Sequence, residues 1–122
     1  MDFILLVQKS GGLFEREPVA DALKNIEGTY NHREVGDVAS VYECQYDEAD
    51  DSTIVRLAKD RKAIVISGSG DASIGLALRL QSILRQPLLA IDSDYSFEVP
   101  LMGISSIEEF WEETANHEPG DG

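Results

Sequence analysis

The sequence predicts a two-layer α+β sandwich: a mainly antiparallel sheet with helices on one face, ferredoxin-like in outline. Three observations support this fold class. Two β-branched runs follow each other at hairpin distance in the middle of the chain, a helical pattern follows them directly, and further strand and helix patterns flank this unit. The 122 residues fit one domain. We expect it to span residues 1–115, with a disordered tail over residues 116–122.

The first two expected elements are a strand and a helix. Residues 3–7 form a continuous apolar run, which is typical of a central strand buried on both faces. Pro18 suits the first position of a helix. Gly28 is the expected break after that helix. The helix has an apolar stripe formed by Val19, Ala22, Leu23 and Ile26.

The segment at residues 29–37 is polar and ambiguous, and we expect its His32 to be a solvated surface residue. Residues 38–46 alternate and predict a strand. One face of that strand carries Tyr42, Cys44 and Tyr46, and the other carries the more polar set of Val41, Glu43 and Gln45. Cys44 is expected to be a small buried hydrophobe rather than a reactive thiol.

The clearest signals lie in residues 52–86. Two β-branched runs, residues 53–57 and 63–67, are separated by five polar-rich residues, which predicts an antiparallel hairpin. A helix is predicted over residues 72–85, ended by Pro87. Its cap is expected from Ser69, Asp71 or Ser73. Its apolar face is expected to comprise Leu76, Ala77, Leu80, Ile83 and Leu84.

The C-terminal part predicts two strands and a helix. Residues 88–91 form a short buried strand, residues 92–94 a turn, and residues 95–99 an alternating strand ended by Pro100. The last helix is expected to begin with a capping box that pairs Ser105 with Glu108 or Ser106 with Glu109. Its expected inner face holds Ile107, Phe110, Trp111 and Ala115, and its outer face holds Glu108, Glu109, Glu112 and Glu113.

Composition restricts the classes of partner. The net charge is −13, from 23 acids and 10 bases, and such a field repels nucleic acid and anionic lipid but attracts basic proteins. The same acidity also keeps a cytosolic protein soluble. No apolar run is long enough to cross a membrane. A single cysteine fits the reducing cytoplasm, where we expect the protein to reside.

Two groups of acids are candidates for partner binding. The first is Asp47, Glu48, Asp50 and Asp51, and the second is Asp92, Asp94 and Glu98. The first group lies in a hairpin loop without the spacing or glycine of an EF-hand loop. It can be a solvated loop, a contact surface for a basic partner, or a weak divalent-cation site. No nucleophile or ligand set accompanies either group, so we expect no catalytic residues, metal or cofactor.

The loop around Gly68 and Gly70 offers an alternative. Backbone amides at a helix N-terminus favour anions, so the loop could hold a phosphate. It lacks the P-loop lysine and a third glycine at dinucleotide spacing, and Asp71 opposes an anion. We therefore favour a plain strand-to-helix connection and expect weak anion binding or none.

A family resemblance rests on the overall type and on one stretch. A small, acidic, one-domain α+β chain with the strand–loop–helix residues Ile66-Ser67-Gly68-Ser69-Gly70-Asp71-Ala72-Ser73 resembles the bacterial immunity proteins of contact-dependent inhibition and other polymorphic toxin systems. The resemblance implies tight binding that blocks a toxin domain, commonly a basic nuclease. It implies no catalytic residues.

The sequence thus favours an immunity protein that neutralises a basic toxin by occluding its active site. The alternative is a small ligand-binding or regulatory domain that uses the Gly68 and Gly70 loop. An enzyme is less favoured, because no nucleophile–base pair is evident. The sequence leaves the oligomeric state open.

Overall fold

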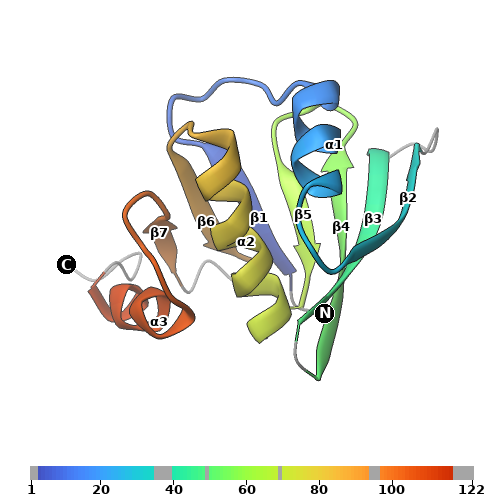
Figure 1. The fold of residues 1–122 in the computed structure, drawn as a ribbon. Coiled ribbons are helices and arrows are strands. Elements are labelled where there is room, and N and C mark those ends of the chain that lie inside the picture. The colour runs from blue at the N-terminus through green and yellow to red at the C-terminus, as the bar shows by residue number, and fades with distance from the viewer. Residues whose placement is uncertain (1–2, 35–39, 49, 69, 94–96, 117–122) are drawn as a thin grey trace.

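The structure, a computed structural model, describes residues 3–34, 40–48, 50–68, 70–93 and 97–116. Over these residues the chain forms seven strands and three helices (Figure 1). None of the described helices is both long and apolar enough to cross a membrane. The elements are β1 (Phe3–Gln8), α1 (Arg16–Lys24), β2 (Thr29–Glu34), β3 (Ser40–Glu48), β4 (Asp51–Ala58), β5 (Ile64–Ser67), α2 (Asp71–Leu84), β6 (Leu88–Asp92), β7 (Glu98–Pro100) and α3 (Ile107–Asn116).

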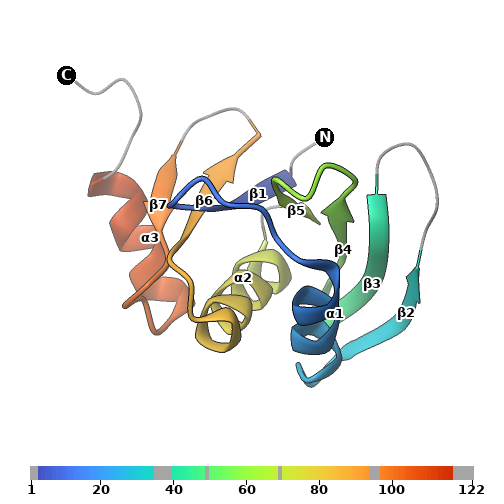
Figure 2. The ribbon, with the colours of Figure 1, turned by 90° about the horizontal axis from the view of Figure 1, so that it is seen from above.

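The strands form one antiparallel sheet in the order β2-β3-β4-β5-β1-β6-β7. Seen from above, the described helices lie on one side of this sheet (Figure 2). The predicted α+β sandwich is therefore confirmed. β5, α2 and β6 form a split β-α-β unit, with β1 between the two strands. The ferredoxin-like outline is not confirmed, because β2 and β3 lie between α1 and β4 in the chain and β7 and α3 follow β6.

The central hairpin has the predicted pairing. β4 and β5 are antiparallel, with Val55 opposite Ile66 and Leu57 opposite Ile64. α2 then covers the sheet with Leu76, Ala77 and Leu80, all fully buried. Ile83 departs from the predicted apolar face, since 39% of its surface is exposed near the C-terminal end of the helix.

One face of the sheet forms the core with the helices. Its fully buried side chains come from every strand between β3 and β7, because alternate residues of a strand point to the same face. They pack against Leu23 of α1, Leu80 of α2 and Phe110 of α3. The strand side chains include Ile4, Leu6, Cys44, Val55, Leu57, Ile64, Ile66, Leu88, Ala90 and Val99. Burial raises the pKa of the Cys44 thiol to about 12, consistent with the expected buried hydrophobe.

The opposite face of the sheet is open. On β1, Ile4 and Leu6 are fully buried, whereas Phe3, Leu5 and Val7 are only partly buried. The prediction that this strand is buried on both faces is therefore wrong. The second set of apolar side chains in this run lies on the open face, where no described helix packs.

β2 is an edge strand that the polar segment did not reveal. It pairs with β3 alone, and its register shifts between Tyr30 and Arg33, where Asn31 has a φ of 54°. An edge strand away from the core tolerates polar residues on both faces, so β2 has no alternating hydrophobic pattern in its sequence. His32 is half-buried rather than solvated. It makes hydrogen bonds to Tyr42 Oη (2.8 Å) and Thr29 Oγ1 (3.0 Å).

Helix α1 is shifted relative to its predicted start and end. It begins at Arg16, so Pro18 is its third residue, and it ends at Lys24 with Asn25 as C-cap. Gly28 has a φ of 98° and lies in the turn to β2. There its carbonyl accepts a hydrogen bond from the Asp47 N–H (3.2 Å). A Cβ at Gly28 would approach the Asp47 carbonyl oxygen to 2.9 Å, so the glycine permits this close approach as well as the turn.

The C-terminal elements largely follow the sequence. β7 includes Pro100, which an edge strand tolerates, and residues 94–96 lie outside the described residues. In α3 the Glu109 N–H donates to Ser106 Oγ (3.1 Å), which confirms one predicted cap, while the Ser105 hydroxyl donates to the Glu109 carboxylate (3.0 Å). α3 extends to Asn116, and the rest of the predicted tail lies outside the described residues.

Candidate partner-binding surface

The turns that carry the two predicted acidic groups lie at the same end of the sheet. β4 runs parallel to β1 across the antiparallel β5, so Asp51 begins β4 at the end where β1 begins. Asp92 pairs with Ile4 at that end, and α2 also begins there after Ser67, which pairs with Phe3. Figure 1 shows the β3–β4 hairpin projecting beyond this end, next to the N-terminus. Two strands separate β4 from β6, so the groups lie roughly 14 Å apart at ordinary strand spacing.

Asp51 caps helix α2. Its Oδ2 accepts a hydrogen bond from the Ala72 N–H (3.1 Å), and its Oδ1 accepts one from the Ser52 N–H (3.0 Å). The N-cap residue itself is Gly70, which has no side chain for the task. The predicted caps at Asp71 and Ser73 are therefore wrong: Ser73 instead donates to the Ser67 carbonyl (2.7 Å). The third predicted cap, Ser69, lies outside the described residues.

Two glycines of this region make room for the hairpin carboxylates. A Cβ on Gly70 would lie 2.6 Å from Asp51 Oδ2, and a Cβ on Gly75 would overlap the Glu48 carboxylate. The amides at the start of α2 thus already have an anion, supplied by the chain itself. This occupancy weighs against the alternative of a ligand site in the Gly68 and Gly70 loop.

Glu48 is also held within the molecule. Its Oε1 accepts from the Tyr46 hydroxyl (2.5 Å) and forms an ion pair with Arg79 Nη2 (3.0 Å). Arg79 Nε also donates to Tyr46 Oη (2.7 Å), and this bond is the main cause that raises the pKa of Arg79. The trio ties the hairpin to α2, so Glu48 supports the fold.

Asp47 and Asp50 are the hairpin acids most available to a partner. Asp47 is exposed and accepts one hydrogen bond from the Tyr30 hydroxyl (3.0 Å). Asp50 is exposed in the turn. Of the four predicted residues in this group, Asp51 and Glu48 therefore stabilise the hairpin, and the other two present carboxylates to solvent.

The second predicted group does not form a cluster among the described residues. Glu98 is exposed and pairs with Ile91, which places it on the open face. Asp92 is partly buried and shares a side of the sheet with Ile4, the helix-covered side. Asp94 lies outside the described residues.

Helix α3 exposes an aromatic side chain that the sequence placed inside. Trp111 is 41% exposed, although its ring contacts Phe97 and Phe110 edge-to-face, with centroids 6.1 and 5.2 Å apart. Exposed Glu108 and Glu112 lie on the same helix. Trp111 neighbours Phe110 in sequence, so it falls at the margin of the apolar stripe, and spacing alone could not reveal its exposure.

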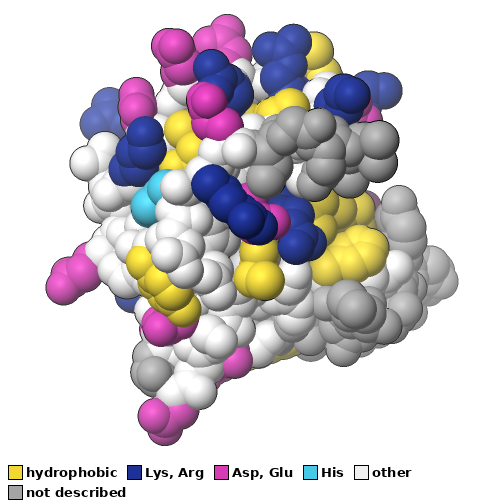
Figure 3. Space-filling view, turned by 90° about the vertical axis from the view of Figure 1, so that its right-hand side faces the viewer, with side chains coloured by type: hydrophobic (Ala, Val, Ile, Leu, Met, Phe, Trp, Pro, Cys, Tyr) yellow, Lys and Arg dark blue, Asp and Glu magenta, His cyan; other side chains and the backbone are white. Residues whose placement is uncertain are grey.

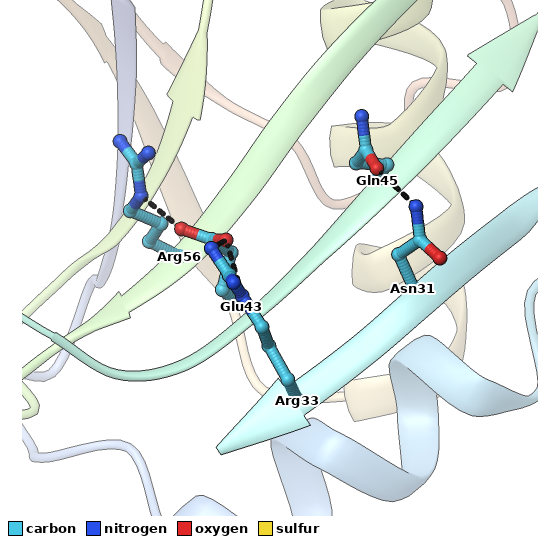
Figure 4. A network of polar contacts seen from close by, with 5 residues as sticks. All are labelled: Asn31, Arg33, Glu43, Gln45 and Arg56. Atoms are coloured by element: carbon cyan, nitrogen blue, oxygen red, sulfur yellow. Dashed lines mark hydrogen bonds and ion pairs between the residues drawn. The ribbon is translucent and has the colours of Figure 1, made fainter. Parts of the chain in front are cut away.

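A polar network on the open face joins β2, β3 and β4. Glu43 Oε1 accepts from Arg56 Nε (2.6 Å), and Oε2 accepts from Arg33 Nε (2.8 Å) and Nη2 (Figure 4). The hydrogen bond from Arg56, then that from Arg33, lowers the pKa of Glu43 despite its burial. Asn31 donates to Gln45 nearby (2.5 Å). Figure 3 shows basic side chains around an acidic one on this side, with apolar side chains exposed beside them.

His32 and Tyr42 line a groove between α1 and β2, together with Arg16 and Lys24. The Thr29 hydroxyl has one proton, and it faces two carbonyl oxygens at 2.8 and 2.9 Å. It must therefore accept from His32 Nε2–H, which leaves Nδ1 to accept from Tyr42. Burial, then Lys24, lowers the pKa of His32, consistent with this neutral ring. Both ring nitrogens of His32 therefore form hydrogen bonds that hold β2 in place.

Among the described residues no group of three or more histidine, cysteine or acidic side chains could hold a metal ion. Comparison of the chain with protein-family models, with curated proteins and with solved structures found no match.

Proposed function

We propose that this protein is an immunity protein of the contact-dependent inhibition type, which binds and neutralises a basic toxin domain. The toxin class that fits is a nuclease, and the mode of action is occlusion of its active site. The proposal places the protein in the cytoplasm, where such a toxin would act. It assigns no catalytic role to any residue of the chain.

The observation that best supports this proposal is the distribution of charge. Four arginines form ion pairs with Glu34, Glu43 and Glu48 among the described residues. The 23 acids outnumber the 10 bases of the chain, so the molecule as a whole presents an excess of negative charge. Asp47 and Asp50 project at a hairpin end, and Glu108 and Glu112 accompany the exposed Trp111 on α3.

The hairpin suits occlusion of a concave site. A nuclease holds its substrate with lysine and arginine side chains, and carboxylates can pair with the same groups. The acidic field would accelerate encounter, and the fit of the hairpin end would set the lifetime of the complex. Asp51 and Glu48 contribute by holding the hairpin against α2, so that little conformational entropy is lost on binding.

The test measures binding to the product of the neighbouring gene. Association and dissociation rates are recorded at low and high salt for the wild type and for Asp47→Lys/Asp50→Lys. The matched control is Glu15→Lys/Glu17→Lys, which changes the net charge equally at exposed positions beside and within α1. We expect the hairpin variant to slow association roughly tenfold more than the control, and to lose protection of cells that express the toxin.

A third variant, Glu108→Lys/Glu112→Lys, tests whether α3 contributes to the contact with the partner. Equal, small effects of all variants would mean that only the overall field acts on the partner. Unchanged rates in every variant, or a partner that binds without salt dependence, would overturn the proposal.

A further inference from the structure

One row of side chains crosses the whole sheet on its open face. Successive pairings place these residues opposite one another, from β2 at one edge to β7 at the other. The row runs Arg33, Glu43, Arg56, Val65, Leu5, Ile91, Glu98. Its apolar part, on β5, β1 and β6, has three charged residues on one side and Glu98 on the other.

The apolar middle belongs to a wider uncovered patch. Val65, Leu5 and Ile91 are only partly buried, in contrast to their fully buried neighbours on the other face. No described helix packs over them (Figure 2). The same face also carries Phe3, Val7 and Leu89, which are partly buried as well. Contiguous apolar surface of this kind marks an interaction site.

The two ends of the row carry opposite charge. At the β2–β4 end, two arginines share the single carboxylate of Glu43, which leaves a net charge of +1. Arg56 uses its Nε for Glu43, and its two terminal nitrogens point away from that carboxylate (Figure 4). At the β7 end, Glu98 is exposed and carries −1.

We propose that this face binds a second copy of the chain, face to face, in a two-fold dimer. A two-fold axis that brings the same face of two copies together must lie in the plane between them. If the axis runs along the strands through β1, it sets β5 of one copy over β6 of the other and β4 over β7. Leu5 then packs on Leu5 and Val65 on Ile91, while Arg56 faces Glu98 across the interface, twice.

The other in-plane axis, across the strands, sets like ends together and pairs arginine with arginine. Charge complementarity therefore selects the first arrangement. The lengths agree as well, since β4 and β7 each lie two strands from β1, roughly 10 Å away. The result is an α-β-β-α assembly whose sheets pack as in a sandwich. This inference does not depend on the proposed function, because the acidic hairpin and its partner play no part in it.

The first experiment measures self-association by sedimentation equilibrium at physiological ionic strength, so that repulsion between two acidic copies is screened. Wild type is compared with Leu5→Lys, and the matched control is Leu13→Lys, a leucine that is 48% exposed in the β1–α1 connection. We expect a dimer in the wild type and in the control, and at least a tenfold weaker dimer in Leu5→Lys. A wild type that stays monomeric at high micromolar concentration overturns the proposal, as does a dimer that Leu5→Lys leaves intact.

The second experiment does not depend on how well Leu5→Lys folds. Glu98→Arg and Arg56→Glu each place like charges opposite one another in the proposed dimer and should weaken it severalfold. Both positions are exposed, and Arg33 still pairs with Glu43 when Arg56 is changed, so the fold should persist. The double variant Arg56→Glu/Glu98→Arg restores opposite charges and should recover much of the lost affinity. If the losses of the two single variants simply add, the two residues do not face each other and the proposed arrangement is wrong.

Discussion

Leu5 and Leu6 are neighbours in the chain and of the same residue type, yet they lie on opposite faces of the sheet and differ in burial. Leu6 is fully buried beneath the helices, whereas Leu5 lies partly exposed on the open face. Across the middle of the covered face, the strand side chains are apolar, as Ile4, Val55 and Ile66 show. Across the open face, apolar residues occupy the middle strands and give way to an arginine–glutamate network on β2, β3 and β4.

Alternation along a strand indicates which residues share a face of the sheet, but not what covers that face. Coverage depends on where the helices lie. α1 and α2 pack on one side because their apolar stripes face it, and no described element performs this role on the other side. The open face is thus stabilised by partial apolar contacts and by charge-assisted hydrogen bonds.

The largest expected difference is between two leucine truncations. Leu6→Ala should destabilise the fold by roughly 2–5 kcal/mol, because it leaves a cavity in the core. Leu5→Ala should cost about 1 kcal/mol, since solvent can fill much of the vacated space. Denaturant melts at low protein concentration, where any dimer dissociates, provide the comparison. Equal losses would show that the open face is covered in solution.

The polar end of the open face can be tested through Glu43. Glu43→Gln should cost about 1–3 kcal/mol at neutral pH, because a charged acceptor for two arginines is lost. Since the folded pKa of Glu43 is lowered, its contribution is present above the ordinary value near 4.5 and disappears as the pH falls through the folded value. Acid titration of stability should therefore be shallower below pH 4.5 in the variant. Parallel titration curves would show that the network does not stabilise the native state.

The end of the sheet offers a smaller contrast between adjacent acids. Asp51→Ala removes the cap of α2 and should cost about 1 kcal/mol. Asp50→Ala changes the charge equally and should stay within about 0.5 kcal/mol of the wild type. Chemical denaturation of both variants measures the difference. If Asp50→Ala proves the more destabilising, Asp51 does not cap the helix in solution.

The smallest expected effect concerns His32 on the edge strand. Its folded pKa is lowered from 6.5, so the unfolded chain binds the proton more readily. The stabilisation is complete above pH 6.5 and declines as the pH falls from there to the folded value. His32→Gln should remove this part of the pH dependence, at a cost below about 1 kcal/mol at pH 8. A resonance assigned to His32 by its absence in His32→Gln, and titrating at 6.5 or above in the folded protein, would contradict the lowered pKa.

The roles of the hairpin acids and of the β2 segment depend on contacts between distant parts of the chain. Hydrophobic pattern identified the hairpin with its helix, and the acids could be located by counting charges. The hydrophobic pattern could not show that Asp51 binds the start of α2, because that contact joins residues about twenty positions apart. The polar β2 segment was ambiguous for a related reason: an edge strand needs no apolar face, so no period marks it.

The amino-acid sequence alone predicts the fold class, the β4–β5 hairpin, helix α2, the buried state of Cys44 and the acidic character of the protein. These features depend on local periodicity, side-chain type and total charge, all of which are present in the chain before it folds. Which carboxylates stabilise the molecule and which face solvent follows from the folded chain. The same holds for the open face of the sheet and for the opposite charges at the two ends of the row that crosses it. Those properties arise from pairing and packing between distant segments, and no window of the sequence contains them.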